Sequence, residues 1–212
     1  MANHVYFNIE VSGVDESEWE QTVLSEKVTR KNYNDEDYTM LEPLELEKQP
    51  FMQGCKPEFD EDDYLKDSYN WYCNNVGAKW CHIESWEYSY ITGYSAWCQP
   101  TAMVENLLEY LSMTYDKDFS AKMTFEDEFR NFIGVEWYDS YKIGDEWAVG
   151  MDESIIDGED INLKVEENYK LDISDDDFDW WGEYKDINGE MTNPSEFADE
   201  LVHAFFDDGV WR

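Results

Sequence analysis

The stretch NWYCNNVGAKWCHIESWEYSYITGYSAWCQP, residues 70–100, contains four of the ten tryptophans and three of the four cysteines of the chain. Within it, Trp80, His82 and Trp86 share one parity, whereas Ile83 and Ile91 share the other. Bulky groups on both parities are typical of a strand that is covered on two sides. Residues 79–91, KWCHIESWEYSYI, are therefore predicted to form a buried strand in the middle of a packed fold.

The cysteines in and before this stretch do not have the spacing of a structural zinc site. Cys55, Cys73, Cys81 and Cys98 include no C-x-x-C pair, although His82 could join Cys73 and Cys98 around a metal ion. Cys81 and His82 are neighbours on a strand and point to opposite faces, so they cannot form a nucleophile–base pair. We expect reduced, mostly buried thiols, with no metal and no cofactor.

The segments before and directly after this stretch have clear periodicities. Residues 4–13, HVYFNIEVSG, alternate apolar and polar side chains and predict a strand. Residues 15–26, DESEWEQTVLSE, begin with acids that suit a helix N-terminus. Residues 27–67 lose periodicity and contain three prolines, which indicates a long insertion. Residues 101–113, TAMVENLLEYLSM, carry one apolar stripe and predict an amphipathic helix.

The C-terminal third is predicted to consist mainly of strands and to end in a helix. Residues 117–139 are expected to form strand, turn and strand, and residues 147–151 alternate again. Asp157-Gly158 suggests a tight hairpin turn, and the apolar residues of 161–173 share a parity. In residues 193–206, NPSEFADELVHAFF, an N-cap asparagine followed by proline predicts a capped helix.

The composition is dominated by negative charge. The 212 residues include 51 Asp and Glu against 15 Lys and Arg, a net charge of -36, while 17% aromatic residues favour a folded core. This field repels phosphates and anionic lipids, so neither direct nucleic-acid binding nor membrane binding is expected. The aromatic-rich strands also lack the basic groove with which proteins bind single-stranded DNA or RNA. The expected partner is the basic surface of a host DNA- or RNA-binding protein; adaptation to high salt remains an alternative.

The candidate contact residues are acidic clusters along the chain. From residue 144 to 212 there are 22 acids and 4 bases, a net charge of 4 minus 22, or -18. The partner-binding candidates are Asp60, Glu61, Asp62, Asp63, Asp152, Glu153, Asp157, Glu159, Asp160, Asp175, Asp176, Asp177, Asp179, Asp207 and Asp208.

One of these clusters partly resembles a calcium loop. In DISDDDFDWWGE, Asp175, Asp177 and Asp179 occupy the first, third and fifth loop positions. Trp180 replaces the loop glycine, and Asp186 stands where the twelfth residue is normally Glu. A solvated acidic turn is the preferred interpretation, and whether it binds a cation is left open.

The common catalytic motifs are missing from the sequence. It has no P-loop, no G-x-G-x-x-G, no H-E-x-x-H and no G-x-S-x-G, and its three histidines are scattered. We therefore expect a protein that is not an enzyme and has no catalytic residues. An enzyme would need a deep pocket with strongly shifted carboxylates.

Residues 69–81, YNWYCNNVGAKWC, resemble the W-x-x-x-N-W-G-T-K-W signature of the YubB-type family, also called Api92-like, of plasmid and bacteriophage proteins. Residues 91–100, ITGYSAWCQP, resemble its F-x-T-A-W-x-P-P segment. Val76 and Gln99 depart from these patterns, so the chain would be a divergent member. The residues that match are Trp71, Asn75, Gly77, Lys79, Trp80, Ala96, Trp97 and Pro100.

The resemblance implies a fold and a setting, but no activity and no catalytic residues. The fold implied is α+β, a ferredoxin-like antiparallel sheet with helices on one face, over residues 1–138 with the insertion at 27–67. Residues 139–212 lie outside it as an acidic, β-rich extension with a C-terminal helix, and whether they share the same core is left open. The setting implied is the host cell cytoplasm, which the absence of an N-terminal signal also favours.

The tryptophans of the two motifs are interpreted as structural. Trp71, Trp80 and Trp97 are expected to anchor the core, and Gly77 to form a turn. Lys79, inside an aromatic segment, should find a carboxylate or ring partner.

Two functions follow from these observations. The first is a non-enzymatic DNA mimic that inhibits a host protein by occupying its nucleic-acid-binding surface. The alternative is a virion-associated or other structural assembly protein of a phage, in which Trp180, Trp181 and Trp211 are buried between copies.

Overall fold

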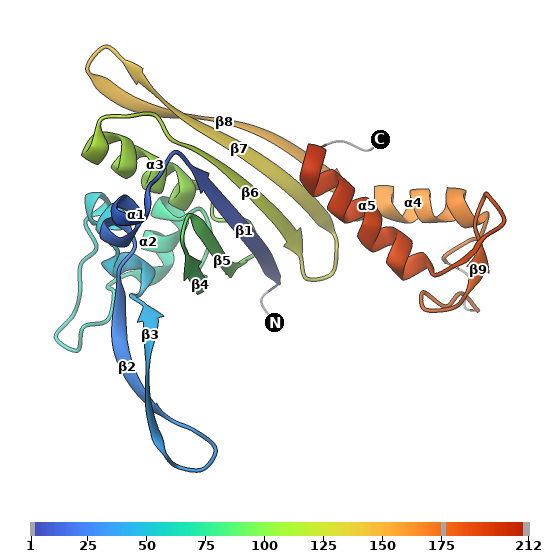
Figure 1. Cartoon of the computed structure of the whole chain (residues 1–212), viewed down its shortest axis with the longest axis horizontal. Helices are drawn as coiled ribbons and strands as arrows, with labels where there is room; N and C mark the ends of the chain where they lie inside the picture. Colours follow the sequence, from blue (N-terminus) through green and yellow to red (C-terminus); the bar gives the residue numbers. More distant parts are fainter. Residues whose placement is uncertain (1–2, 175–176, 210–212) are drawn as a thin grey trace. The chain divides into compact units, whose positions relative to one another are not determined.

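The computed structural model describes residues 3–174 and 177–209 and has a mixed α/β fold with a six-stranded antiparallel sheet. The strand order in the sheet is β4-β5-β1-β6-β7-β8 (Figure 1). The elements are β1 (His4–Ser12), α1 (Glu16–Thr22), β2 (Ser25–Lys31), β3 (Asp37–Pro43), η1 (Leu46–Lys48), η2 (Pro50–Cys55), α2 (Ser68–Asn75), β4 (Cys81–Glu87), β5 (Tyr90–Ala96), α3 (Thr101–Tyr115), β6 (Ser120–Asp127), β7 (Phe132–Ile143), β8 (Glu146–Asp157), α4 (Gly158–Tyr169), β9 (Tyr184–Lys185), β10 (Met191–Thr192) and α5 (Pro194–Asp208).

The chain divides into two compact units. Unit 1 comprises Met1–Phe125 and Glu136–Asp152, and unit 2 comprises Glu126–Val135 and Glu153–Arg212. The chain passes between the units inside β6, β7 and β8. The second segment of unit 1 includes residues on both sides of the boundary expected between 138 and 139.

The first predicted strand is confirmed as β1. Val5, Phe7 and Ile9 are buried, and the residues between them are exposed, because alternate side chains of a strand point to opposite faces. β1 pairs antiparallel with β5, with Ile9 opposite Ile91. One face of these strands therefore belongs to the core of unit 1, and the other is open.

The single strand expected across residues 79–91 is wrong. Its residues instead form a hairpin of β4 and β5, joined at Ser89, which has a left-handed φ of 59°. His82 lies opposite Tyr94 on the open face of the sheet, but a β-bulge between Ile83 and Ser85 shifts the register. Trp86 therefore lies opposite the buried Ile91 on the core face, with its ring centroid 6.1 Å from that of Phe51. Alternation alone could not reveal this turn, because Tyr88 and Ser89 interrupt neither the parity nor the aromatic character of the segment.

The helix expected after Pro100 is confirmed as α3. Met103, Val104, Leu107 and Leu111 are buried, so its apolar stripe packs into the core. The helix expected at residues 15–26 is confirmed as α1, where Asp15 and Glu18 form a capping box.

The insertion at residues 27–67 contains more regular structure than its sequence indicated. β2 and β3 form a two-stranded hairpin, which Figure 1 shows as an arm extending from the rest of unit 1. The buried side chain of Gln49 closes the base of this arm: its Nε2 donates to the carbonyls of Leu24 and Leu44, and its Oε1 accepts from the Leu24 amide.

The prediction that the C-terminal third is mainly strands is wrong beyond β8. Asp157 caps the N-terminus of α4 rather than opening a hairpin. Ile161, Val165 and Tyr169 are buried and lie four residues apart, which is a helical stripe, whereas Leu163 is exposed. A spacing of four also conserves parity, so the helix stripe was mistaken for strand alternation.

The terminal helix is confirmed as α5. The side chain of Asn193 accepts hydrogen bonds from the Ser195 and Glu196 amides, and Pro194 occupies the first turn. Figure 1 shows α4 and α5 side by side in unit 2. In the described part of the chain no helix is long and apolar enough to span a membrane.

Candidate functional site

The two motif segments meet at the start of α3. Gly77 has a left-handed φ of 93°, and a Cβ there would lie 3.3 Å from the Ala102 amide. Cys98 Sγ donates to the Gly77 carbonyl at 2.9 Å, and the Met103 amide donates to the Val76 carbonyl. Gly77 is thus a turn residue, as expected, and the motifs hold the helix against the preceding loop.

The three motif tryptophans do not behave alike. Trp71 is buried and donates through Nε1 to the Cys55 carbonyl, and Trp80 is half-buried. Trp97 was expected in the core, but it is 52% exposed, because it occupies a left-handed position just after β5 that turns its ring outward. Lys79 Nζ lies 4.7 Å from the centroid of the Trp97 ring, which supplies the ring partner expected for that lysine.

A buried carboxylate stands beside this junction. Glu136 of β7 is fully buried and accepts from Gln99 Nε2 at 2.8 Å and from Thr101 Oγ1 at 3.0 Å, and also from the Tyr138 hydroxyl. All three donors are neutral, and Thr101 opens α3, whose positive dipole end favours a nearby carboxylate. Burial, then the Glu136 charge, raises the pKa of the Tyr138 hydroxyl. The network has a structural explanation in positioning α3.

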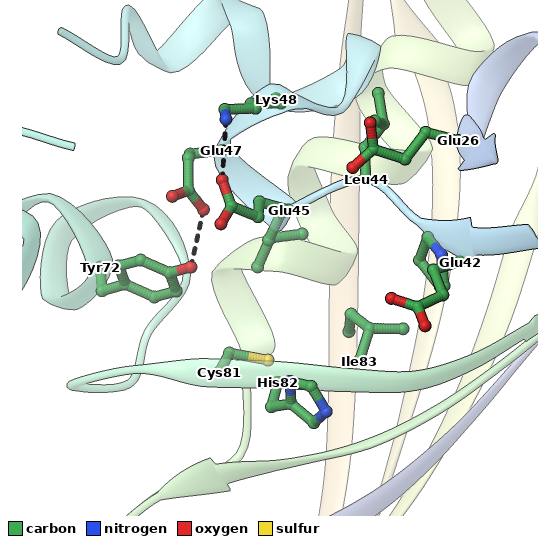
Figure 2. Close-up of a pocket in the computed structure, with 12 residues that line it drawn as sticks. Glu26, Glu42, Leu44, Glu45, Glu47, Lys48, Tyr72, Cys81, His82 and Ile83 are labelled. Carbon is green, nitrogen blue, oxygen red and sulfur yellow. Dashed lines mark hydrogen bonds and ion pairs between the residues drawn. The ribbon is translucent and has the colours of Figure 1, made fainter. Parts of the chain in front are cut away.

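Unit 1 also contains a pocket of about 470 Å³ rich in carboxylates. Figure 2 shows Glu45 and Glu47 at one side of it and Glu42 at another, with Lys48 reaching toward Glu45. Glu47 is buried and accepts from the Tyr72 hydroxyl at 2.8 Å. Lys48 Nζ lies 2.9 Å from Glu45 and 2.7 Å from the Asp63 carboxylate.

Three groups in this pocket are held in their protonated forms. Burial, then the charge of Glu47, raises the pKa of Tyr72, and burial raises the pKa of Cys81. Hydrogen bonds to Asp63 and Glu45 raise the pKa of Lys48. At neutral pH these groups are a phenol, a thiol and an ammonium, so none of the three is poised as a nucleophile or base.

Cys81 and His82 lie on opposite faces of β4, as expected. Cys81 is buried and pairs with Ser95, whereas His82 is exposed and pairs with Tyr94. All four cysteines are free thiols. Among residues 3–174 and 177–209, no group of three or more His, Cys, Asp or Glu side chains is arranged to hold a metal ion.

The open face of the sheet carries a cluster of rings around Tyr94. The Tyr94 centroid lies 5.1 Å from His82, 5.2 Å from His4, 5.8 Å from Trp80 and 6.1 Å from Tyr6. These contacts are edge-on or tilted, so the rings pack on one another. Unit 1 holds 29 acids and 10 bases, a net charge of 10 minus 29, or -19, which opposes phosphate binding on this face.

The first acidic cluster, Asp60–Asp63, forms a turn in unit 1. All four side chains are exposed. The Asp60 carboxylate accepts from the Asp62 and Tyr64 amides, and Asp63 pairs with Lys48. Two members of this cluster therefore have structural roles that compete with partner binding.

The remaining described clusters belong to unit 2, apart from Asp152 at the end of unit 1. Asp157 caps α4, and Asp179 accepts from the Trp181 amide. Asp175 and Asp176 lie outside the described residues. The cluster members that are described and exposed here are Asp152, Glu153, Asp157, Glu159, Asp160, Asp177, Asp179, Asp207 and Asp208.

Unit 2 is the more densely charged unit. Its sequence has 22 acids and 5 bases, a net charge of 5 minus 22, or -17, in about half the length of unit 1. Of its 20 described carboxylates 15 are exposed, so this charge is displayed to solvent rather than neutralised inside.

Sequence reasoning did not find the Glu47–Tyr72 pair or the Glu136 network. Tyr72 lies 25 residues from Glu47, and Thr101 and Gln99 lie 35 and 37 residues from Glu136, although Tyr138 is only two residues away from it. Among 51 carboxylates no local signal distinguishes the buried ones.

No protein-family model matches the chain, and no curated protein or solved structure is significantly similar to it. The resemblance to the YubB-type family therefore stays a prediction.

Proposed function

We propose that this chain is a non-enzymatic, acidic interaction protein that occupies the basic nucleic-acid-binding surface of another protein and competes there with DNA or RNA. The observation that carries the proposal is the exposed charge of unit 2, a net of -17 with 15 exposed carboxylates. Duplex DNA presents about one negative charge per 1.7 Å of axis, and its ligands bind through Lys and Arg. A folded unit dense in carboxylates offers such ligands an alternative anion.

The folded state matters for this competition. Charges farther apart than a Debye length of about 8 Å are screened at physiological salt, so binding requires carboxylates held at fixed positions. In unit 2 several of them are fixed by hydrogen bonds from backbone amides: Asp157 accepts from Glu159, Asp172 from Ser174 and Asp179 from Trp181.

The ferredoxin-like arrangement and the phage or plasmid setting are part of the same proposal. The strand order β4-β5-β1-β6 and the placement of α3 between β5 and β6 support that arrangement. The setting rests on the motif resemblance of residues 69–81 and 91–100. A host cell target in the cytoplasm follows from that setting.

The non-enzymatic character rests on the sequence, which lacks the common catalytic motifs and in which the three histidines are scattered.

The test uses the intact chain as bait in bacterial lysate. The proteins that bind to it are eluted first with a salt gradient and then with duplex DNA. We expect a nucleic-acid-binding protein that DNA displaces and that an unrelated, equally acidic bait does not retain. In a variant with Asp175, Asp176, Asp177 and Asp179 replaced by Asn, binding to that protein should weaken measurably, because four charges are removed from unit 2.

The matched control removes the same charge from unit 1. Glu16, Glu20, Glu84 and Glu87 are replaced by Gln, because all four are exposed in unit 1 and none belongs to a candidate contact cluster. Equal weakening by the two variants would show non-specific attraction. Retention of only the proteins that the acidic control bait also retains would refute mimicry.

Assembly with copies of the chain is the second candidate. It is favoured by the exposure of Trp181, although Trp180 is half-buried within unit 2 and Trp211 lies outside the described residues. Light scattering on the purified chain separates the two functions: a stable oligomer that persists in high salt favours assembly.

A further inference from the structure

Unit 2 contains an aromatic pocket of about 460 Å³, here called the Trp181 pocket. Its lining includes Trp180, Trp181 and Phe129, together with Ile161 of α4 and Ala198 of α5. The Trp181 and Phe129 side chains are 73% and 71% exposed. The rings of Trp181 and Phe129 are both exposed to solvent at the same pocket, and exposed apolar surface of this kind often marks an interaction site.

The backbone holds both exposed rings in place. The Trp181 amide donates to Asp179 Oδ1 at 3.0 Å, and Asn193 Nδ2 donates to the Trp181 carbonyl at 2.9 Å. The buried carboxylate of Asp127 accepts from the amides of Phe129 and Asn131 at 3.1 Å. Each ring is therefore mounted on a fixed segment, which lowers the entropic cost of binding a ligand.

The pocket's own cation is already neutralised. Arg130 Nε lies 2.6 Å from Glu126, and its Nη2 lies 2.5 Å from Asp199. Because both sides of the guanidinium face carboxylates, Arg130 does not repel a second cation.

The surroundings of the pocket attract positive charge. Exposed acids adjoin its lining in sequence: Glu128 precedes Phe129, while Asp157, Glu159 and Asp160 surround the start of α4. Elsewhere in the chain lysines pair with rings, as Lys142 does with Trp147 at 5.2 Å. Exposed rings within a negative field favour a cation over a neutral apolar group.

We infer that the Trp181 pocket binds an arginine side chain of a basic partner protein. The planar guanidinium stacks on the exposed rings of Trp181 and Phe129, and its aliphatic stem contacts Ile161 and Ala198. Lysine fits less well, because its compact ammonium cannot stack. The inference rests on the proposed function for its basic partner, and adds the side chain that the pocket selects.

The full chain is titrated into a fluorescein-labelled peptide of alternating arginine and glycine at about 0.15 M salt. Fluorescence anisotropy of the peptide measures the affinity of binding. Trp181→Ala and Phe129→Ala should each weaken binding about fivefold. Tyr64→Ala, which removes a ring that is 71% exposed in unit 1, should leave binding unchanged. Trp181→Phe should retain most of the affinity, and the matching lysine peptide should bind the wild type more weakly.

Unchanged binding in the two pocket variants, or an equal loss in Tyr64→Ala, overturns the inference. So does an oligomer that Trp181→Ala dissociates, which would assign the pocket to a second copy. Failure of the proposed function gives a different result. The arginine peptide then binds and Trp181→Ala weakens that binding, but no protein captured from the lysate is displaced by DNA. If Trp181→Ala leaves both peptide binding and DNA competition intact, the proposed function stands and the arginine pocket is rejected.

Discussion

Gly93 is a residue of β5 at which the backbone leaves no room for a side chain. A Cβ there would lie 2.2 Å from the His82 carbonyl oxygen of β4 and 2.8 Å from the Phe7 ring. Neither a paired strand nor a fully buried ring can retreat by the distance required.

Gly93→Ala should therefore destabilise the protein by about 1–3 kcal/mol through overpacking. Urea unfolding measured by circular dichroism checks the value. Gly54→Ala is the matched control, because a Cβ at Gly54 meets nothing within 4 Å. A Gly93→Ala variant as stable as Gly54→Ala would contradict the close approach of the two strands.

The buried Cys81 thiol is predicted to make the folded protein less stable at alkaline pH. Burial raises its pKa above the ordinary value of 9.0, so the unfolded chain releases this proton at a lower pH than the folded chain. Its contribution is fully present below about pH 9 and is lost as pH rises from there toward the folded pKa, at up to about 1.4 kcal/mol per pH unit.

The check is urea unfolding across pH 8 to 10, roughly the range in which a free thiol titrates. Cys81→Ala should lower the free energy of unfolding at pH 8, but above pH 9 that free energy should fall less steeply with pH than in the wild type. An equally steep decline in this variant would assign the loss of stability at alkaline pH to other groups, such as Tyr72 and Tyr138, whose pKa values burial also raises.

At the scale of elements, α4 depends on the cap that sequence periodicity did not reveal. The Asp157 carboxylate accepts from the Glu159 amide at 3.0 Å and also contributes to the negative surface of unit 2. Its structural and electrostatic roles can be separated, because asparagine caps a helix about as well as aspartate.

Asp157→Ala should destabilise α4 by about 1 kcal/mol, whereas Asp157→Asn should stay within about 0.5 kcal/mol of the wild type. Hydrogen exchange of the amides in residues 158–169 measures the difference. Faster exchange in both variants would mean that the charge at this helix terminus, not the hydrogen bond, stabilises α4.

Elements with a local signal could be predicted, and those that depend on distant contacts could not. α3 and α5 have long apolar stripes, and Pro194 and Asn193 mark the start of α5. The β4–β5 hairpin and α4 were missed, because a turn at Ser89 and a stripe with a spacing of four both preserve parity. The acidic clusters could be predicted from the charged residues of the sequence, but the Trp181 pocket beside them could not.

At the scale of the whole molecule, a net charge of -36 makes stability dependent on salt. Like charges repel most in the compact state, so screening should stabilise folding. The melting temperature should rise between about 10 mM and 0.5 M NaCl. The variant with Asn at positions 175, 176, 177 and 179 should melt higher at low salt and show a smaller rise. A melting temperature that falls with salt would indicate that ion pairs such as Arg130 with Asp199 outweigh the repulsion.

The sequence alone determined the charge, the first strand and the capped or strongly striped helices, because composition, alternation and capping act within a few residues. Only the tertiary structure decided which rings are buried, since exposure depends on segments far apart in sequence. Trp97 turns outward at the end of β5, Glu136 is buried against the start of α3, and Trp181 and Phe129 come together at one pocket although 52 positions separate 129 from 181.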